Sequence, residues 1–448
     1  MKVLISVPGF TQEYQEIEYR VFNGDGEPSR VTARMPAQAF ADVSQVDHVI
    51  LLIPDSLGTG ETYDRLQKAA IRLALEPFQK STDSQHLTVV LDGDLLEPSQ
   101  KSTKLHPFVL PSRYATHISG DIRDFYQAVV FFLSRWFAEH LVSKDDNLEI
   151  MVEASTGLNI LQIFVYRAVR EVAGVLAFVR DVTLRVYNSD PVRRDTQHAD
   201  IFLTEEHAPL HATLARIHIE STPRWATPYK NTPHPGQDPQ YRKIRDWLVT
   251  RWSGQEASAF LNAAYHGIPL GIVHWFCPQP EEIFQGLETL RQYVLTRVFR
   301  DPTTGGWVRP VRLGPDVAPY ALGALLSRQL QIHWSFFTEA LRHDGATYTQ
   351  IETFMKTMYR HHPVILNRFL AERSIQPDRI ACSQYPSLLA HCVRNRGGCR
   401  NTNAIDQRNF FAHAGFERCA VEVFQDTGGK VHFRYAEGAK DTIMRWLH

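Results

Sequence analysis

Near-continuous apolar runs that alternate with helical patterns constrain the fold of this 448-residue chain more than any other feature. Five such runs fall in its first half, at 3–7, 49–53, 87–91, 148–152 and 182–187. Runs of this kind are typical of strands that are buried on both faces of a sheet. Helical patterns lie between them, near 63–75, 122–141 and 158–172. The alternation predicts a doubly wound, mainly parallel sheet, a Rossmann-like α/β fold.

The second half has a different pattern. Alternating residues at 212–219 predict a last strand of the first domain, and five prolines within 222–240 predict an extended linker. Amphipathic helical patterns then follow near 241–252, 256–266, 281–299, 320–342, 349–372 and 385–396. Residues 421–424 and 431–435, with Gly428 and Gly429 between them, predict a β-hairpin. We therefore expect an α/β part followed by a mainly α-helical part, in two or three domains.

Composition limits the class of protein. Hydrophobic residues make up 44% of the chain and charged residues 22%, which is typical of a globular protein. The 48 basic and 49 acidic residues give a net charge of −1, so any nucleic-acid contact must be local. The first apolar run is interrupted by Pro8 and Gly9 and is too short for a signal peptide, and no run is long enough for a membrane helix. We expect a cytosolic protein without membrane contact.

The cysteines suggest reduced thiols. Four of the five lie near the C-terminus, in no secreted disulfide framework, although sequence leaves the redox state of Cys392 and Cys399 open. A zinc site built from Cys382, His391, Cys392, Cys399 and His413 was weighed, but the six residues between Cys392 and Cys399 do not match the spacing of structural zinc ligands. No metal is expected.

The loops after three of the predicted strands are candidates for a ligand site, because ligands of such sheets bind at the carboxyl ends of the strands. The candidate residues are Pro8, Gly9 and Phe10, then Pro54, Asp55 and Ser56, and finally Ser155, Thr156, Gly157 and Asn159. The last loop leads into a helix, whose free amides could hold a phosphate or a base edge. Alternatively, Ser155 or Thr156 only caps that helix. No G-x-G-x-x-G dinucleotide motif follows any strand.

Arg408 and His413, with four residues between them in a mostly apolar stretch, pair a fixed cation with a proton-transfer group. His413 could help a ribose 2′-hydroxyl attack the adjacent phosphate while Arg408 stabilises the developing charge. The substrate would be RNA, and the products would carry a 2′,3′-cyclic phosphate and a 5′-hydroxyl. No metal is needed. Alternatively, Arg408 makes a surface ion pair and His413 is structural.

The helix that carries this pair poses a geometric problem. If residues 406–414 are helical, Asn409 shares a face with His413, but Arg408 lies about 140° away. Either the helix end distorts, or two copies of the motif meet across a two-fold axis. We favour the second, because Phe410, Phe411 and Phe416 offer apolar surface for such a junction. The helix C-terminus would favour a protonated His413, and Gly415 predicts a left-handed stop.

Three further segments have two interpretations each. Asp92, Gly93 and Asp94 predict a solvated turn or an ion site. The segment 361–363, His-His-Pro, predicts a helix boundary. The basic stretch 394–401 is either a solvated loop or a guide for an RNA strand.

These residues resemble a known family. Arg408 to His413 resembles the R-N-x-x-A-H form of the HEPN ribonuclease motif, and residues 153–159 resemble the strand-loop signature of the CARF domain. Residues 4–9 and 52–56 are similar to the family's first two strands and their loops. In this order they look like the CRISPR-associated accessory ribonucleases of type III systems, the Csx/Csm group, most like the Csx type.

The resemblance implies an allosterically activated ribonuclease. A cyclic oligoadenylate, with four adenylates expected and six the alternative, would bind at the strand-end loops of paired N-terminal domains. It implies a homodimer, with higher assemblies left open, whose HEPN site uses Arg408, Asn409 and His413 on single-stranded RNA. The implied domains are a CARF-like sensing domain at 1–222, a proline-rich and helical connecting region at 223–300, and a HEPN domain at 301–448. Whether the CARF domain degrades its activator, and which RNA sequence is cut, stay open.

A signal route through residues 222–300 is expected from this order. Two other classes of protein compete with it. One is a non-catalytic nucleotide sensor that recruits a nucleic acid or protein, with 241–247 as a weak candidate for a basic recognition helix. The other is a toxin-like HEPN ribonuclease controlled by a protein antidote.

Overall fold

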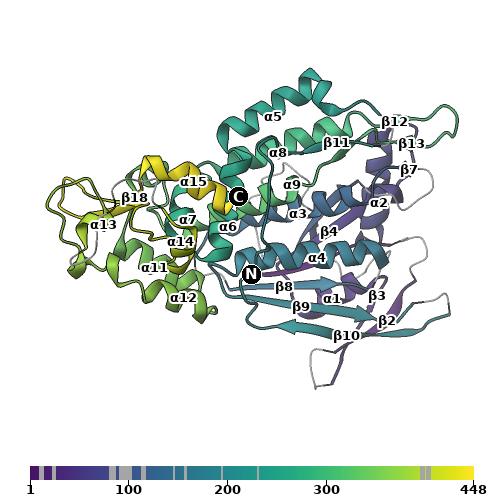
Figure 1. Ribbon diagram of the computed structural model, residues 1–448. Helices are drawn as coiled ribbons and strands as arrows, with labels where there is room; N and C mark the ends of the chain where they lie inside the picture. The colour runs from purple at the N-terminus through teal and green to yellow at the C-terminus, as the bar shows by residue number, and fades with distance from the viewer. Residues whose placement is uncertain are drawn as a thin grey trace.

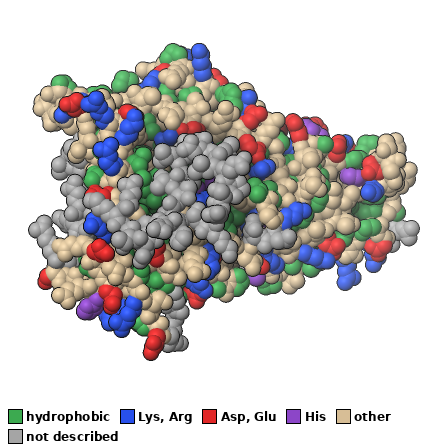
Figure 2. All heavy atoms as spheres, turned by 180° about the vertical axis from the view of Figure 1, so that it is seen from behind, with side chains coloured by type: hydrophobic (Ala, Val, Ile, Leu, Met, Phe, Trp, Pro, Cys, Tyr) green, Lys and Arg blue, Asp and Glu red, His purple; other side chains and the backbone are tan. Residues whose placement is uncertain are grey.

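Two lobes make up the molecule, a broad body around a large sheet and a narrower C-terminal lobe (Figure 1). The computed structural model describes residues 1–9, 15–22, 27–79, 87–89, 103–111, 118–144, 147–155, 159–192, 195–229, 232–393, 399 and 405–448. Basic and acidic side chains are interspersed over the visible described surface in Figure 2, in keeping with the net charge of −1. No helix in these ranges is long and apolar enough to cross a membrane.

A nine-stranded sheet with the order β3-β2-β10-β9-β8-β1-β4-β6-β5 forms the body. Neighbouring strands are parallel from one edge to β9: β5 (Leu87–Val89), β6 (Thr103–Leu110), β4 (His48–Pro54), β1 (Lys2–Ser6), β8 (Leu148–Glu153) and β9 (Val182–Ser189). Each predicted apolar run of the first half overlaps one of these strands, so the Rossmann-like expectation is confirmed, although β6 was not predicted.

The other edge of the sheet was not predicted. There β10 (His198–His207) runs antiparallel to β9, β2 (Ile17–Phe22) parallel to β10, and β3 (Ser29–Ala33) antiparallel to β2. Strand β2 alternates buried and half-buried residues rather than forming a continuous apolar run. Its hydrophobic pattern in the sequence is therefore weaker than that of the central strands.

Helices cover both faces of the sheet. Alternate residues of β1 separate the two cores: Val3 and Ile5 pack with α3 (Arg123–His140) and α4 (Asn159–Leu176), while Leu4 packs with α1 (Pro36–Ser44) and α2 (Tyr63–Gln79). This is the consequence of the two-residue period of a strand. The helices at 63–75, 122–141 and 158–172 are thus confirmed.

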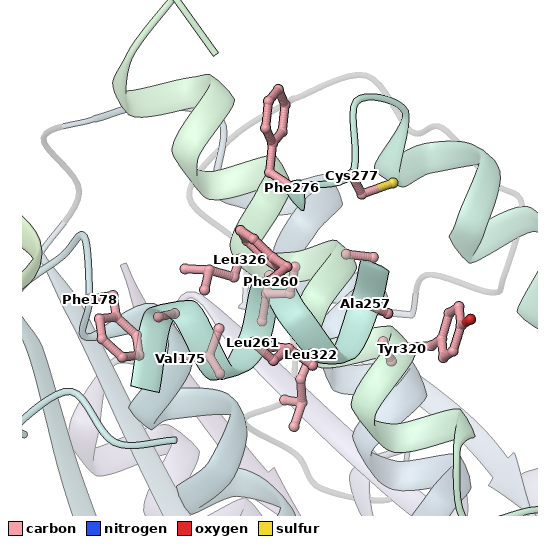
Figure 3. Packing of buried hydrophobic residues seen from close by; sticks show 14 of the residues in the cluster. Val175, Phe178, Ala257, Phe260, Leu261, Phe276, Cys277, Tyr320, Leu322 and Leu326 are labelled. Atoms are coloured by element: carbon pink, nitrogen blue, oxygen red, sulfur yellow. The ribbon is translucent and has the colours of Figure 1, made fainter. Parts of the chain in front are cut away.

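The helical second half shares a core with the sheet domain. It begins with α5 (Pro239–Arg251), α6 (Gly254–His266), α7 (Pro269–Trp275), α8 (Pro280–Leu295) and α9 (Val317–His333). Figure 3 shows Val175 and Phe178, at the end of α4, beside Phe260 and Leu261 of α6 and Leu326 of α9. The two halves are therefore packed together as one body.

Two expectations for the region between the halves were wrong. The expected strand at 212–219 makes no ladder; Thr213 N donates to Gly174 O (3.2 Å) and Ile217 N to Asn262 Oδ1 (2.9 Å), so helices provide its partners. The proline-rich segment is not a free linker. Its Trp225 is fully buried, and β11 (Ala226–Pro228) pairs antiparallel with β14 (Val311–Leu313).

The C-terminal lobe combines short helices with a small sheet, β15-β18-β17-β16. Its elements are α10 (Glu339–Asp344), β15 (Ala346–Thr347), α11 (Tyr348–Met358), α12 (Pro363–Leu370), β16 (Ser387–Leu388), α13 (Leu389–Cys392), α14 (Gln407–Ala412), β17 (Val421–Gln425), β18 (Val431–Tyr435) and α15 (Glu437–Leu447). The predicted hairpin is confirmed. So is the helix boundary at 361–363, because Pro363 begins α12. Of the helix expected at 385–396, the described part, up to Val393, contains only the single turn of α13.

The remaining short elements complete the described chain. They are β7 (Ile118–Ser119), β12 (Phe299–Arg300), β13 (Trp307–Val308) and the 3-10 turns η2 (Asp55–Leu57), η3 (Pro235–Gln237), η4 (Arg373–Ile375) and η5 (Pro377–Arg379).

The expectation of reduced thiols was wrong for four cysteines. Cys382 is bonded to Cys392 and Cys399 to Cys419, while Cys277 is free and buried. An antiparallel bridge between Ile380 and Val393 brings the first pair together. The three cysteines considered for zinc are thus all engaged in disulfides.

Candidate functional site

The motif helix α14 is short and anchored at both ends. Asp406 caps its N-terminus, because its Oδ1 accepts a hydrogen bond from Asn409 N at 2.8 Å. Phe410 is fully buried, with its ring centroid 5.5 Å from that of Trp446. Arg408 and Asn409 are exposed, and among the described residues no carboxylate pairs with Arg408. The helix thus buries one apolar side chain and presents its polar side chains to solvent.

The apolar surface expected around a two-fold junction is largely used inside the chain. Phe410 is fully buried and Phe416 is 1% exposed, whereas Phe411 is half-buried. The argument from three exposed phenylalanines was therefore wrong, because the small lobe needs these rings for its own core.

His413 lies just beyond the helix, at its C-cap, with backbone φ −99° and ψ 28°. Its Nδ1 is 2.6 Å from Glu372 Oε2. A carboxylate only accepts, so Nδ1 carries the proton and Nε2 is left to act on a ligand. The His413 side chain is 43% exposed and that of Glu372 is 9% exposed. Glu372 therefore orients the imidazole through its Nδ1 side, while the ring stays accessible from solvent, as a proton-transfer group must be.

Glu372 was missed by sequence reasoning. It lies 41 residues before His413, after the end of α12, and no spacing pattern connects the two. Its other oxygen, Oε1, accepts from Ser374 N at 2.9 Å, so the carboxylate is itself held in place.

The turn after His413 follows the prediction. Gly415 has φ +85°, and its N donates to Phe410 O at 2.8 Å. Ala414 also has a positive φ, of 50°, which sequence did not indicate. Two successive left-handed residues turn the chain sharply, and Phe416 then enters the core.

The second candidate site lies at the carboxyl edge of the sheet. In the sheet, β4 flanks β1 on one side and β8 flanks it on the other, and both strands follow β1 in the chain, so β1 is at a topological switch point. Ser6 Oγ donates to Glu153 Oε2 at 2.7 Å, and Ser155 N donates to Glu153 Oε1 at 2.7 Å. Ser155 Oγ accepts from Ser189 N at 2.6 Å. A buried carboxylate and two hydroxyls are thus grouped at this edge, and sequence reasoning had not singled out Ser6 or Glu153.

The predicted ligand residues differ in how deeply they are buried. Gly9 and Ser155 are half-buried at the edge, whereas Pro8, Asp55 and Ser56 are buried. Pro54 ends β4 and Asn159 begins α4. Phe10, Thr156 and Gly157 lie outside the described residues, as do Asp92 to Asp94 and all of the basic stretch 394–401 except Cys399.

Asp55 belongs to a buried ionic cluster. Its Oδ2 accepts from the Tyr63 hydroxyl at 2.5 Å and lies 3.3 Å from Arg309 Nη2, with both charged side chains fully buried. Burial raises the pKa of Tyr63 well above its usual value and that of the nearby Asp124 to about 8. In this structure Asp55 therefore ties the β4 edge to the segment after β13. Among the described residues, no group of three or more His, Cys, Asp or Glu could hold a metal ion.

Comparison with known proteins assigns both sites to domains. Residues 3–191 match the model of the CARF domain of the CRISPR system endoribonuclease Csx1, and residues 350–437 match the model of its HEPN domain. The chain belongs to this family of CRISPR-associated endoribonucleases. A curated relative, the CRISPR system endoribonuclease Csx1 of Methanocaldococcus jannaschii, is 21% identical over 450 residues, which is 96% of this chain and 89% of that protein.

The matched regions contain the two sites. Arg408, His413 and Glu372 all lie in the HEPN match, and the edge with Ser6, Glu153 and Ser155 lies in the CARF match. CARF domains are ligand-binding sensors, so the chain combines a sensor with a ribonuclease domain.

Proposed function

We propose that this chain is a cytoplasmic, metal-independent endoribonuclease of type III CRISPR defence that cuts single-stranded RNA when a cyclic oligoadenylate binds its CARF domain. The observation that carries the proposal is the His413 to Glu372 hydrogen bond of 2.6 Å, in a HEPN domain whose Arg408 is exposed. It gives the motif an oriented base and a cation that is available for phosphate.

The chemistry follows from these groups. His413 Nε2 takes the proton of a ribose 2′-hydroxyl, and O2′ attacks the adjacent phosphorus. Arg408 pairs with the phosphate oxygens, and the exposed Asn409 amide donates to them as well. The bond from phosphorus to O5′ breaks, and O5′ receives a proton from an imidazolium or water. The products are a 2′,3′-cyclic phosphate and a 5′-hydroxyl, and no metal takes part.

The active form is a homodimer in this proposal, alone or within an assembly of dimers. Helix α14 has only six residues and contains Arg408, while His413 is its C-cap; an ideal helix would place these two side chains about 140° apart. Two copies related by a two-fold axis would place the arginine of one against the histidine of the other.

The activator is most simply cyclic tetra-adenylate, bound across the paired CARF edges. Gly9 and Ser155, with the buried Glu153 behind them, support this because hydroxyl, amide and carboxylate groups can recognise adenine and ribose edges. The other predicted contacts are Pro8, Phe10, Pro54, Asp55, Ser56, Thr156, Gly157 and Asn159. Asp55 and Ser56 are buried here, so their contact would require rearrangement of the loop after β4.

The test is cleavage of labelled single-stranded RNA in EDTA, with and without cyclic tetra-adenylate or cyclic hexa-adenylate. We expect cleavage only with an activator, no effect of EDTA, cyclic phosphate ends, and at least a hundredfold loss in His413→Ala. Full activity of His413→Ala would refute the catalytic assignment. Strong cleavage without nucleotide would favour control by a protein antidote, and activator binding without cleavage would favour a non-catalytic sensor.

A further inference from the structure

Glu372 is the only described partner of the His413 imidazole, so whatever positions Glu372 positions the base. Glu372 follows α12 directly, and its N donates to Phe369 O at 3.0 Å in the last turn. Its Oε1 is fixed by Ser374 N in the next 3-10 turn. The carboxylate therefore moves with the C-terminal end of α12.

The N-terminal end of α12 is attached to the CARF domain. In the turn before it, Arg360 Nη2 contacts Asp181 Oδ1 at 2.9 Å, and its guanidinium also donates to the carbonyl oxygens of Phe178 (3.4 Å) and Arg180. His362 Nε2 is 2.7 Å from Ala212 O. One guanidinium thus holds three residues of a four-residue turn in the other domain, which fixes direction as well as distance.

The turn that Arg360 holds is the end of α4. Arg180 N donates to Leu176 O at 3.0 Å, so the turn continues the helix. Phe178 also packs edge to face on Tyr359, with ring centroids 5.8 Å apart, in the shared core of Figure 3. Helix α4 has 18 residues and is about 27 Å long. Its other end begins four residues after Ser155, at the edge of the sheet.

We propose that Arg360 and α12 form a positioning strut that couples α4 of the CARF domain to the catalytic histidine through Glu372. The inference rests on the proposed function and adds its regulation. A displacement of α4 at the ligand edge is carried by a rigid helix to Arg360, then by α12 to Glu372, and changes the orientation of His413. The route is direct and does not pass through residues 222–300.

The coupling requires two arrangements of α4 relative to α12, of which the ligand favours one. Arg360 is a suitable link because its side chain is only 24% exposed while its partner Asp181 is 67% exposed. The guanidinium is anchored mainly on backbone carbonyls, so its position follows the position of the end of α4 rather than that of a mobile side chain.

The test is Arg360→Met, which keeps the apolar stem and removes the guanidinium. Binding of labelled cyclic tetra-adenylate should stay within about threefold of wild type, while the RNA cleavage rate at saturating activator falls about tenfold or more. Lys356→Met is the matched control, because Lys356 pairs only with Glu352 on α11, at 3.1 Å, four residues before Arg360. The control should bind and cleave as wild type.

A second variant shows whether the effect of Arg360→Met comes from the lost contact or from misfolding. Asp181→Asn removes only the exposed partner of Arg360, and it should lower the activated rate by about two- to fivefold without changing the melting temperature. Combined with Arg360→Met, it should cause no further loss, because the pair acts as one link. Wild-type activation in Arg360→Met would overturn the strut. Failure of the wild type itself to cleave RNA would instead refute the proposed function.

Discussion

At the scale of residues, the proposed catalytic motif is incomplete without Glu372. An isolated histidine rotates and exchanges its ring protons between two nitrogens, whereas a carboxylate 2.6 Å from Nδ1 fixes both the orientation and the tautomer. The carboxylate is 9% exposed and held by Ser374, so the orienting group is rigid. This arrangement prepares Nε2 for proton transfer before RNA binds.

Glu372→Gln should therefore lower kcat about 10- to 100-fold, because an amide can present its NH2 to Nδ1 and stabilise the wrong tautomer. KM should stay within about threefold, since Arg408 still binds phosphate. Steady-state cleavage of a short RNA at saturating activator measures both constants. Glu422→Gln is the control: Glu422 pairs with Arg434 at 2.7 Å on the neighbouring hairpin and should leave kcat unchanged. Equal kcat in Glu372→Gln and wild type would contradict the orienting role.

At the scale of elements, the turn after α14 locks the motif helix into the lobe. Gly415 combines a left-handed backbone with a close approach, since a Cβ there would lie 2.5 Å from Ile268 Cγ2. The position thus links α14 to the segment before α7, and the sharp turn returns the chain to the core. A side chain would have to displace Ile268 or the helix.

Gly415→Ala should destabilise the chain by about 2–4 kcal/mol, through left-handed strain of about 1 kcal/mol and overpacking. Gly305→Ala separates the two effects, because Gly305 has φ +68° but nothing within 4 Å of its added Cβ. It should cost only about 1 kcal/mol. Urea unfolding of both variants, followed by circular dichroism, measures the difference. Equal destabilisation would show that the contact with Ile268 is unimportant.

At the scale of the whole molecule, the two domains are fused by a common core rather than joined by a flexible linker. Helix α9 of the second half packs on α3 and α4, and Arg309 forms a buried ion pair with Asp55 at the edge of β4. A body packed in this way responds to a ligand by shifts between packed elements. The strut at Arg360 is one such contact, and a two-fold dimer would double it.

Mixing variants tests whether the active site is shared between copies. In our proposal, Arg408→Ala and His413→Ala are each inactive. If each site takes Arg408 from one copy and His413 from the other, however, a mixed dimer of the two variants retains one site with both wild-type groups. After exchange of subunits, RNA cleavage should recover to about a quarter of wild type, because half of the dimers are mixed and each has one intact site. No recovery after confirmed exchange would place both groups in a single chain.

The sequence determined the local features of this protein. Apolar runs located five of the six strands from β5 to β9, all except β6, because burial on both faces leaves a clear pattern. Gly415 marked the end of the motif helix because few other residues accept a left-handed backbone. The family resemblance, carried by the segments around Ser155 and His413, pointed to a sensor joined to a ribonuclease, and the domain matches confirm it. The half-exposed strands β2, β3 and β10 were not predicted, because strands of mixed burial leave a weaker hydrophobic pattern in the sequence.

Only the tertiary structure decided which distant residues meet. The contacts of Glu372 with His413, of Arg360 with the end of α4, and of Asp55 with Arg309 join segments 41, about 180 and 254 residues apart in the chain. Such pairs leave no periodic signal, because each depends on how whole helices and strands pack. The same packing turned part of the expected linker into a paired strand next to the buried Trp225, and it brought the cysteines together. Sequence thus pointed to the candidate motif, whereas packing supplied the carboxylate that contacts its histidine.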